Sequence, residues 1–278
     1  MSMKKSTFLF VMFAGLSVGQ AATLIDLTVA GSSSTNTANI GGSFFVQQVP
    51  DQSTGTGVIN SFLRINSNDP SEQGFNTGTN NVLDNVGGVF TRPLLLSEVP
   101  IVTLAGTQYR QFLLDVNQTG ASPKLSLNQI QLFQRNGDTG LFSVSAAGVN
   151  DPPVIAITGA TEVFRMNNGG APNQAFLEIQ LDFSLNAGSG SGDMFLYVRN
   201  ILFNVNLTNV FLYSQFGSQP GVYAETDGFE EWSVLKGGCT VNCVPDPAVP
   251  EPASVVLLGT LAAGIILPLR RRFAARQA

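Results

Sequence analysis

The chain has 278 residues, of which 44% are hydrophobic and 12% are charged, about half the charged fraction of an average soluble domain. Its length is sufficient for one large β domain or two small ones. Because the chain contains no histidine, Ser–His and Cys–His nucleophilic pairs and most designs of zinc hydrolase are excluded.

The N-terminal segment carries the pattern of a secretory signal peptide. Lys4 and Lys5 precede the apolar run FLFVMFAGLSVG, and small residues follow up to Ala21. This pattern predicts a signal peptide over residues 1–21, with cleavage after Ala21 and export of the rest of the chain. Residues 22–40 include the low-complexity run GSSSTNTAN and are predicted to be a mobile lead-in.

Charge is distributed unevenly along the chain. Six of the fourteen basic residues lie in the two terminal segments, and all nineteen acidic residues lie between them. The middle of the chain therefore has eight basic against nineteen acidic residues, a net charge of −11. A surface of this sign repels phosphate backbones, so no nucleic-acid partner is expected.

Residues 41–240 read as short strands joined by loops rich in Asn, Gly, Ser and Pro, which favour turns. In the clearest segment, apolar residues from Leu177 to Leu185 alternate with polar ones, the pattern of a half-buried strand in an antiparallel sheet. The glycine-rich run NAGSGSGD then predicts a hairpin to the segment MFLYV. A break in the alternation between Asn128 and Gln129 predicts a β-bulge.

Further strand-like runs recur through the same region, and long amphipathic helical patterns are missing from it. These runs are SFFVQQV, VINSFLRI, IVTLAG, YRQFLLDV, LSLNQIQLF, LFSVS, VFLYSQF and FEEWSVL. About ten short strands separated by turn-rich loops predict an all-β domain over residues 41–240, an antiparallel β-sandwich of the jelly-roll type.

Two motifs in this domain invite a catalytic interpretation. Asp138-Thr139-Gly140 resembles half of an aspartic-protease signature, but a second copy is missing and the preceding Asn136-Gly137 predicts a hairpin turn. Glu230 and Glu231 stand directly before the only tryptophan, Trp232, as in a sugar-binding platform. We expect instead that Trp232 faces the core while both glutamates face water. No catalytic residue and no cofactor are predicted, and the domain is expected not to be an enzyme.

One loop gathers oxygen ligands of the kind that calcium accepts. The run NSNDPSEQ contains Asn66, Asn68, Asp69 and Glu72. Their spacing does not match an EF-hand loop, and Asn and Asp also favour turns for local reasons. No metal site is therefore predicted, and calcium in this loop is the alternative.

The two cysteines, Cys239 and Cys243, close the predicted domain. In an exported protein they are expected to form a disulfide, which would enclose only a five-residue loop. Free thiols are the alternative, and zinc would need two further ligands in a chain without histidine.

The C-terminal region divides into a spacer and a membrane segment. Residues 241–252 contain four prolines and are predicted to be a stiff, extended linker. The next seventeen residues carry no charge and would span roughly 25 Å as a helix, near the lower limit for a bilayer core. Arg270, Arg271 and Arg272 follow at once, so residues 253–278 are predicted to be a transmembrane helix with a cytoplasmic basic tail.

The motif Val249, Pro250, Glu251 and Pro252, followed by one apolar helix and an arginine cluster, resembles the sorting signal of PEP-CTERM proteins. The resemblance covers about the last thirty residues. It implies an exported protein of a Gram-negative bacterium, anchored first in the inner membrane and processed there by the membrane protease exosortase. It also implies placement at the cell surface or in the extracellular matrix, in association with exopolysaccharide and biofilm.

These observations together predict a non-enzymatic surface or matrix protein whose partners are the membrane, an exosortase-type protease and exopolysaccharide. Two alternatives stay open. Polar loops with aromatic residues would also suit a carbohydrate-binding module acting on exopolysaccharide, and carboxylates on distant strands would suit a secreted glycan hydrolase.

Overall fold

The computed structural model of the chain describes residues 23–33, 42–47, 59–80, 82–145, 153–167, 177–188, 190–217, 223–226 and 228–236. Over these residues the chain forms fifteen strands and three short 3-10 helices, η1 (Leu96–Glu98), η2 (Phe183–Leu185) and η3 (Asn200–Leu202), and no α-helix. The all-β class predicted from the sequence is confirmed.

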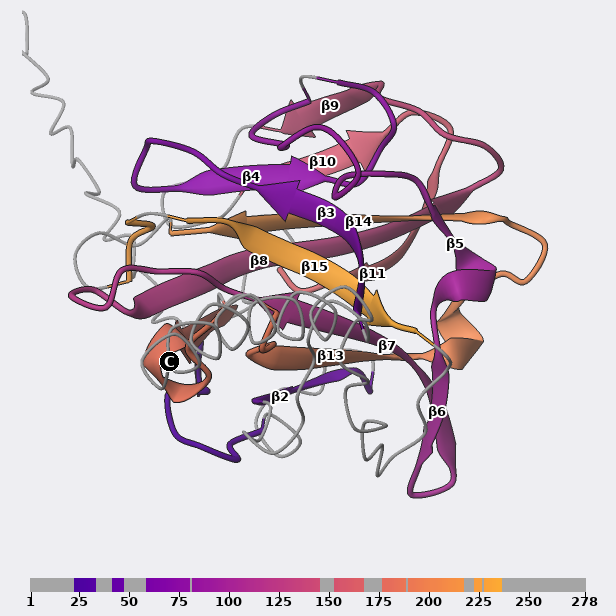
Figure 1. The fold of residues 1–278 in the computed structure, drawn as a ribbon. Helices are drawn as coiled ribbons and strands as arrows, with labels where there is room; N and C mark the ends of the chain where they lie inside the picture. Colours follow the sequence, from indigo (N-terminus) through magenta and orange to yellow (C-terminus); the bar gives the residue numbers. More distant parts are fainter. Residues whose placement is uncertain are drawn as a thin grey trace, which may run out of the picture.

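One sheet has seven strands (Figure 1). Its main path is β1 (Thr23–Asp26), β12 (Leu177–Asp182), β8 (Lys124–Arg135), β14 (Asn209–Phe216) and β4 (Glu72–Phe75), with β11 (Thr161–Arg165) beside β8 and β5 (Leu94–Leu95) beside β14. All pairs in this sheet are antiparallel except β1 with β12, which is parallel.

The second sheet has six strands, all antiparallel. Its main path is β2 (Phe44–Gln47), β13 (Met194–Arg199), β7 (Thr107–Asp115), β15 (Glu230–Leu235) and β3 (Ile59–Ile65), with β6 (Ile101–Leu104) beside β7. A separate pair consists of β9 (Phe142–Ser145) and β10 (Val154–Ile157).

The strand orders of the two sheets correspond position by position. Consecutive strands β1 and β2, β12 and β13, β8 and β7, β14 and β15, and β4 and β3 occupy equivalent places in the two sheets. The chain therefore passes from one sheet to the other at each of these connections. The pairing registers place four of them, after β3, β7, β12 and β14, at the same end of the domain.

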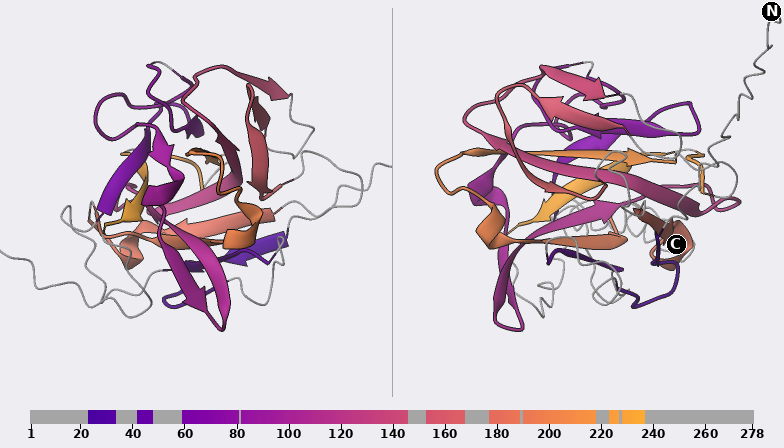
Figure 2. Two further views of the ribbon diagram at one scale, coloured as in Figure 1. Left: turned by 90° about the vertical axis from the view of Figure 1, so that its right-hand side faces the viewer. Right: turned by 180° about the vertical axis from the view of Figure 1, so that it is seen from behind.

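The main hydrophobic cluster contains buried side chains of both sheets, among them Phe112 and Trp232 from one and Leu127 and Leu212 from the other. Aromatic and aliphatic side chains of β4, β8 and β14 form a second cluster with Ile155 of β10. The β9–β10 pair accordingly lies on the outer side of the seven-stranded sheet, away from β13 and β2 (Figures 1 and 2).

Two details of the strands agree with their sequence patterns. The residues that alternate from Leu177 form β12, which ends at Asp182. The side chain of Asp182 accepts a hydrogen bond from the Ser184 amide at 2.9 Å, and η2 begins at the next residue. The predicted bulge is confirmed, because Gln129 and Leu127 are paired with successive residues of β14 and Asn128 is the extra residue between them.

Two expected hairpins and one expected mobile segment differ from the structure. β12 and β13 do not form a hairpin, since they belong to different sheets. The turn at Asn136-Gly137 is present, with φ 74° at Gly137, but β8 is not paired with β9. Thr23–Asp26, expected in a mobile lead-in, form β1 at the edge of the seven-stranded sheet. Turn residues reverse the chain locally but do not determine which sheet the next strand joins.

The shared cluster between the two sheets should dominate stability. Phe112 is fully buried in it on a central strand, so Phe112→Ala should reduce the free energy of unfolding by about 3–5 kcal/mol through lost burial and a cavity. Ile201→Ala removes a side chain that is 80% exposed and should change the free energy of unfolding by less than about 0.5 kcal/mol. Urea unfolding of the two variants checks this, and equal losses would contradict the placement of the core.

Candidate functional site

The sequence-predicted sorting motif at 249–252, the arginines at 270–272 and the two cysteines Cys239 and Cys243 lie outside the described residues. Their predicted roles therefore stay predictions. Within the ranges that the structure describes, no helix is long and apolar enough to cross a membrane.

The segment around Trp232 differs from the prediction in the exposure of its two glutamates. Trp232 is fully buried, and its Nε1 donates a hydrogen bond to Ser214 Oγ at 3.0 Å, as expected for a core residue. The glutamates do not face water, however: Glu230 is 0% and Glu231 7% exposed. Glu231, on the opposite face of β15 from Trp232, is paired with Arg64, whose Nε lies 2.6 Å from Glu231 Oε2.

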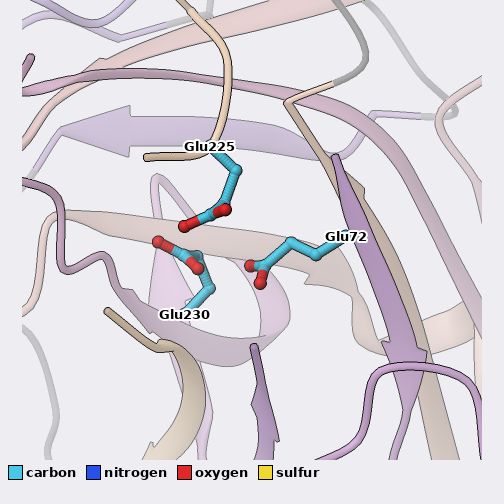
Figure 3. A group of neighbouring side chains, drawn as sticks. All are labelled: Glu72, Glu225 and Glu230. Carbon is cyan, nitrogen blue, oxygen red and sulfur yellow. The ribbon is translucent and has the colours of Figure 1, made fainter. Parts of the chain in front are cut away.

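Glu230 meets two other acidic side chains, Glu72 and Glu225. One carboxylate oxygen of each lies within 4.8 Å of the others, and Figure 3 shows the three carboxyl groups pointing toward one another. Glu72 is the first residue of β4, Glu230 is the first residue of β15, and Glu225 lies in the segment that precedes β15. These three residues are called the glutamate triad below.

The alternation of strand residues explains why two of these side chains point inward. Glu230 lies two residues before the core residue Trp232, and therefore on the same face of β15. Glu72 lies two residues before Gly74, where a Cβ atom would touch the core side chain of Ile65. Both glutamates consequently project into the space between the two sheets.

The third glutamate is positioned by contacts between two connections. The Glu225 amide donates a hydrogen bond to the carbonyl of Pro70 at 3.0 Å, which joins the β14–β15 connection to the β3–β4 connection. Gly217 has φ 68°, and a Cβ atom there would collide with Pro70 and Glu225. A side chain at position 217 would force these two connections apart.

Glu72 and Glu230 have few partners for their charge among the described residues. Among the described residues, neither carboxylate oxygen of Glu72 has a hydrogen-bond partner, although the residue is only 1% exposed. Glu230 accepts a hydrogen bond through Oε1 from Gln118 Nε2 at 2.7 Å and is also bonded by the backbone of Asn117, while its Oε2 has no partner within the same residues. The three ion pairs of the described residues involve other glutamates.

Burial and mutual repulsion favour the protonated form of Glu72 and Glu230. Burial first, and then the charges of Glu230 and Glu225, raise the pKa of Glu72 to about 12. Burial also raises the pKa of Glu230, and raises that of the nearby Asp193 well above its ordinary value. Without a bound cation, the cluster therefore keeps at least one proton at neutral pH.

A polar pocket of about 350 Å³ lies beside the triad. Its lining residues are Asn66, Ser67, Asn68, Asp69, Pro70, Glu225 and Thr226. Three of the four residues named in the calcium alternative line this pocket, but the fourth, Glu72, lies in the triad instead. Glu225 belongs to both, so the pocket borders the triad on the side of this residue.

Asp138 has a structural role that fits its interpretation as a turn residue. Its carboxylate accepts hydrogen bonds from Thr77 Oγ1 at 3.1 Å and from the Gly78 amide at 2.8 Å. These bonds tie the connection after β8 to the segment that follows β4.

The geometry limits what the triad can do chemically. Glu72 and Glu230 are too deeply buried to touch a polysaccharide chain, which excludes this pair as the acid and nucleophile of a glycan hydrolase. Carboxylate oxygens that converge within 4.8 Å can share a proton or bind a hard cation. The chain offers no histidine to this site, so its ligands are oxygen atoms.

Sequence reasoning missed Glu225 and Glu230 as members of a site. For Glu230 a signal existed, because a core position for Trp232 also places the residue two positions earlier on the core face. Glu225 follows no strand pattern, and only the meeting of two distant connections brings it to the triad.

Comparison of the chain with protein-family models, with curated proteins and with solved structures gave no match.

The retained protons predict how stability depends on pH when a chelator removes divalent cations. Above pH 5 the unfolded chain releases the Glu72 proton near the ordinary value of 4.5, whereas the folded chain retains it. Stability should therefore fall as pH rises from 5 to 8, by up to about 1.4 kcal/mol per pH unit for each retained proton. Glu72→Gln should make this slope shallower in urea unfolding.

Glu98→Gln is the control for this measurement. The pKa of Glu98 is lowered, with hydrogen bonds from Arg92 and Leu95 outweighing the effect of burial, so its carboxyl group is ionised in both states above pH 5. This variant should lose stability through the broken ion pair but keep the wild-type slope. An unchanged slope in Glu72→Gln would show that Glu72 is ionised in the folded protein.

Proposed function

We propose that the chain is a non-enzymatic protein of the cell surface or extracellular matrix, exported by its N-terminal signal and sorted through a C-terminal signal of the PEP-CTERM type. The observation that carries this proposal is the order of the terminal segments: a proline-flanked glutamate at 249–252, then seventeen uncharged residues, then three arginines. Association with exopolysaccharide belongs to the same proposal.

The described domain suits a structural role of this kind. We interpret its two sheets, which bury one common cluster and exchange consecutive strands at equivalent positions, as a jelly-roll β-sandwich. Such a fold supplies a rigid body with many surface loops. In the proposed arrangement this body is held off the membrane by the extended linker at 241–252.

The proposal predicts two processing events that intact-mass analysis of the native protein can detect. We expect loss of residues 1–21 and loss of the segment that follows the motif at 249–252. Replacing Pro250 and Pro252 with alanine should leave the C-terminal segment attached, because the recognition motif is gone. Replacing Pro245 and Pro247 is the matched control, since it changes the same linker outside the motif. A native protein that ends at Ala278 would contradict the sorting proposal.

A second candidate function, contact with a polysaccharide, is favoured by one surface feature. Phe90 and Phe229 are 39% and 41% exposed, and the Arg64 guanidinium carbon lies 3.4 Å and 5.0 Å from their ring centroids. Exposed aromatic rings beside an arginine can stack on sugar rings and donate hydrogen bonds to hydroxyl groups.

Binding to the cell's own exopolysaccharide tests this second candidate. Replacing Phe90 and Phe229 together with alanine should weaken retention in affinity electrophoresis at least threefold. Val205→Ala is the control, because it removes an apolar side chain that is 77% exposed elsewhere on the surface. Equal retention of wild type and the double variant would exclude the aromatic pair, and release of reducing ends would indicate a hydrolase instead.

A further inference from the structure

We propose that the glutamate triad, Glu72, Glu225 and Glu230, binds a calcium ion between the two sheets. The site lies where the β3–β4 and β14–β15 connections meet at one end of the domain. This proposal does not depend on the sorting signal or on polysaccharide binding.

The ligand geometry supports a cation of calcium's size. Calcium binds oxygen at 2.3–2.6 Å, so ligands on opposite sides of the ion lie up to about 5 Å apart. The triad oxygens lie within 4.8 Å of one another and are therefore within the span of one ion. Carboxylates can each supply one or two oxygens, and calcium accepts six to eight ligands in a flexible geometry.

Burial without a partner is the second, independent observation. Glu72 is 99% buried, its carboxyl group points at the other two, and within the described residues neither of its oxygens has a hydrogen-bond partner. A carboxylate in this position costs several kcal/mol unless a proton or a cation compensates its charge. Among the described residues, no arginine or lysine forms an ion pair with Glu72 or Glu230.

Room for water and support of the site are also present. The pocket lined by the 66–70 loop and Glu225 lies next to the triad, and its volume of about 350 Å³ has room for water molecules. Gln118 joins two members of the site, because its Nε2 donates to Glu230 while its Oε1 accepts from the amide of Thr226 at 3.1 Å, next to Glu225. A neighbour of this kind orients ligands before the ion binds.

The nature of the ligands distinguishes calcium from other metals. Oxygen ligands alone favour calcium, magnesium or manganese over zinc and copper. Magnesium requires a near-ideal octahedron at 2.0–2.1 Å and keeps most of its water, which a buried cluster of three carboxylates does not easily provide. Calcium bound here would connect β4 of one sheet to β15 of the other.

The test uses the purified full chain in mild detergent after dialysis against EGTA. We expect calcium chloride to give a 1:1 binding isotherm, with a dissociation constant of about 10⁻⁴–10⁻³ M, as in extracellular modules. Saturating calcium, 100-fold above this constant, should raise the melting temperature by roughly 5–10 °C. No heat of binding and no shift in melting temperature would overturn the proposal, as would a larger shift with magnesium than with calcium.

Variants locate the binding. Glu72→Gln and Glu230→Gln keep the shape of the side chains and should weaken calcium binding at least tenfold. Glu231→Gln is the matched control, since it neutralises the next residue of β15, which lies on the opposite face and is paired with Arg64. Calcium binding that is unchanged in both triad variants, or lost equally in the control, would overturn the assignment of the site.

A luminescence measurement does not depend on the stability of the variants. Terbium replaces calcium in oxygen sites, and Trp232, the only tryptophan, lies two residues from Glu230, about 7 Å along the strand. Excitation of Trp232 should therefore sensitise bound terbium in the wild type, and added calcium should abolish the emission. In Glu72→Gln the emission should fall at least tenfold, whereas emission equal to that of the wild type would overturn the proposal.

Discussion

The structure of the domain depends on four connections that cover one end of the space between the two sheets. Four connections pass from sheet to sheet there, and they bring Glu72, Asp115, Asp193, Glu225 and Glu230 to the same end. Some of these charges are satisfied by backbone amides, as at Asp115, which accepts hydrogen bonds from Gly190 and Gly192. The triad has no such arrangement for Glu72, and its charge must be balanced by a proton or an ion. The stability of this end of the domain therefore depends on whether the three carboxyl groups hold protons or bind a cation.

The longer strands were predictable because apolar residues recur along them on the face that turns toward a hydrophobic cluster. Alternation of apolar residues identified β12, and a break in alternation identified the bulge at Asn128. The partners of the strands were not predictable in the same way. The run between β12 and β13 has the glycines of a tight turn, yet the chain uses their freedom to cross to the other sheet. The pairing of these strands follows burial across the whole domain, and the turn residues between them do not indicate it.

The candidate site also has one residue that a strand pattern indicates and others that depend on the topology. The core position of Trp232 implies an inward-facing Glu230, so this residue could have been identified from the period of a strand. Glu72 begins a four-residue strand, EQGF, that is too short and too polar to show alternation. Glu225 lies in a connection whose place is decided by its hydrogen bond to Pro70, more than 150 residues earlier in the chain. Sites built from connections of different strand pairs appear only when the topology is known.

The direction of the last strand relates this site to the rest of the chain. β15 begins at Glu230, in the triad, and runs away from it to Leu235 at the opposite end of the domain. The chain thus leaves the last strand of the domain on the side farthest from the carboxylate cluster before it reaches the proline-rich segment at 241–252. The triad and the pocket beside it therefore lie at the opposite end of the described domain from the point where the chain leaves β15, so the C-terminal end of this strand takes no part in the site.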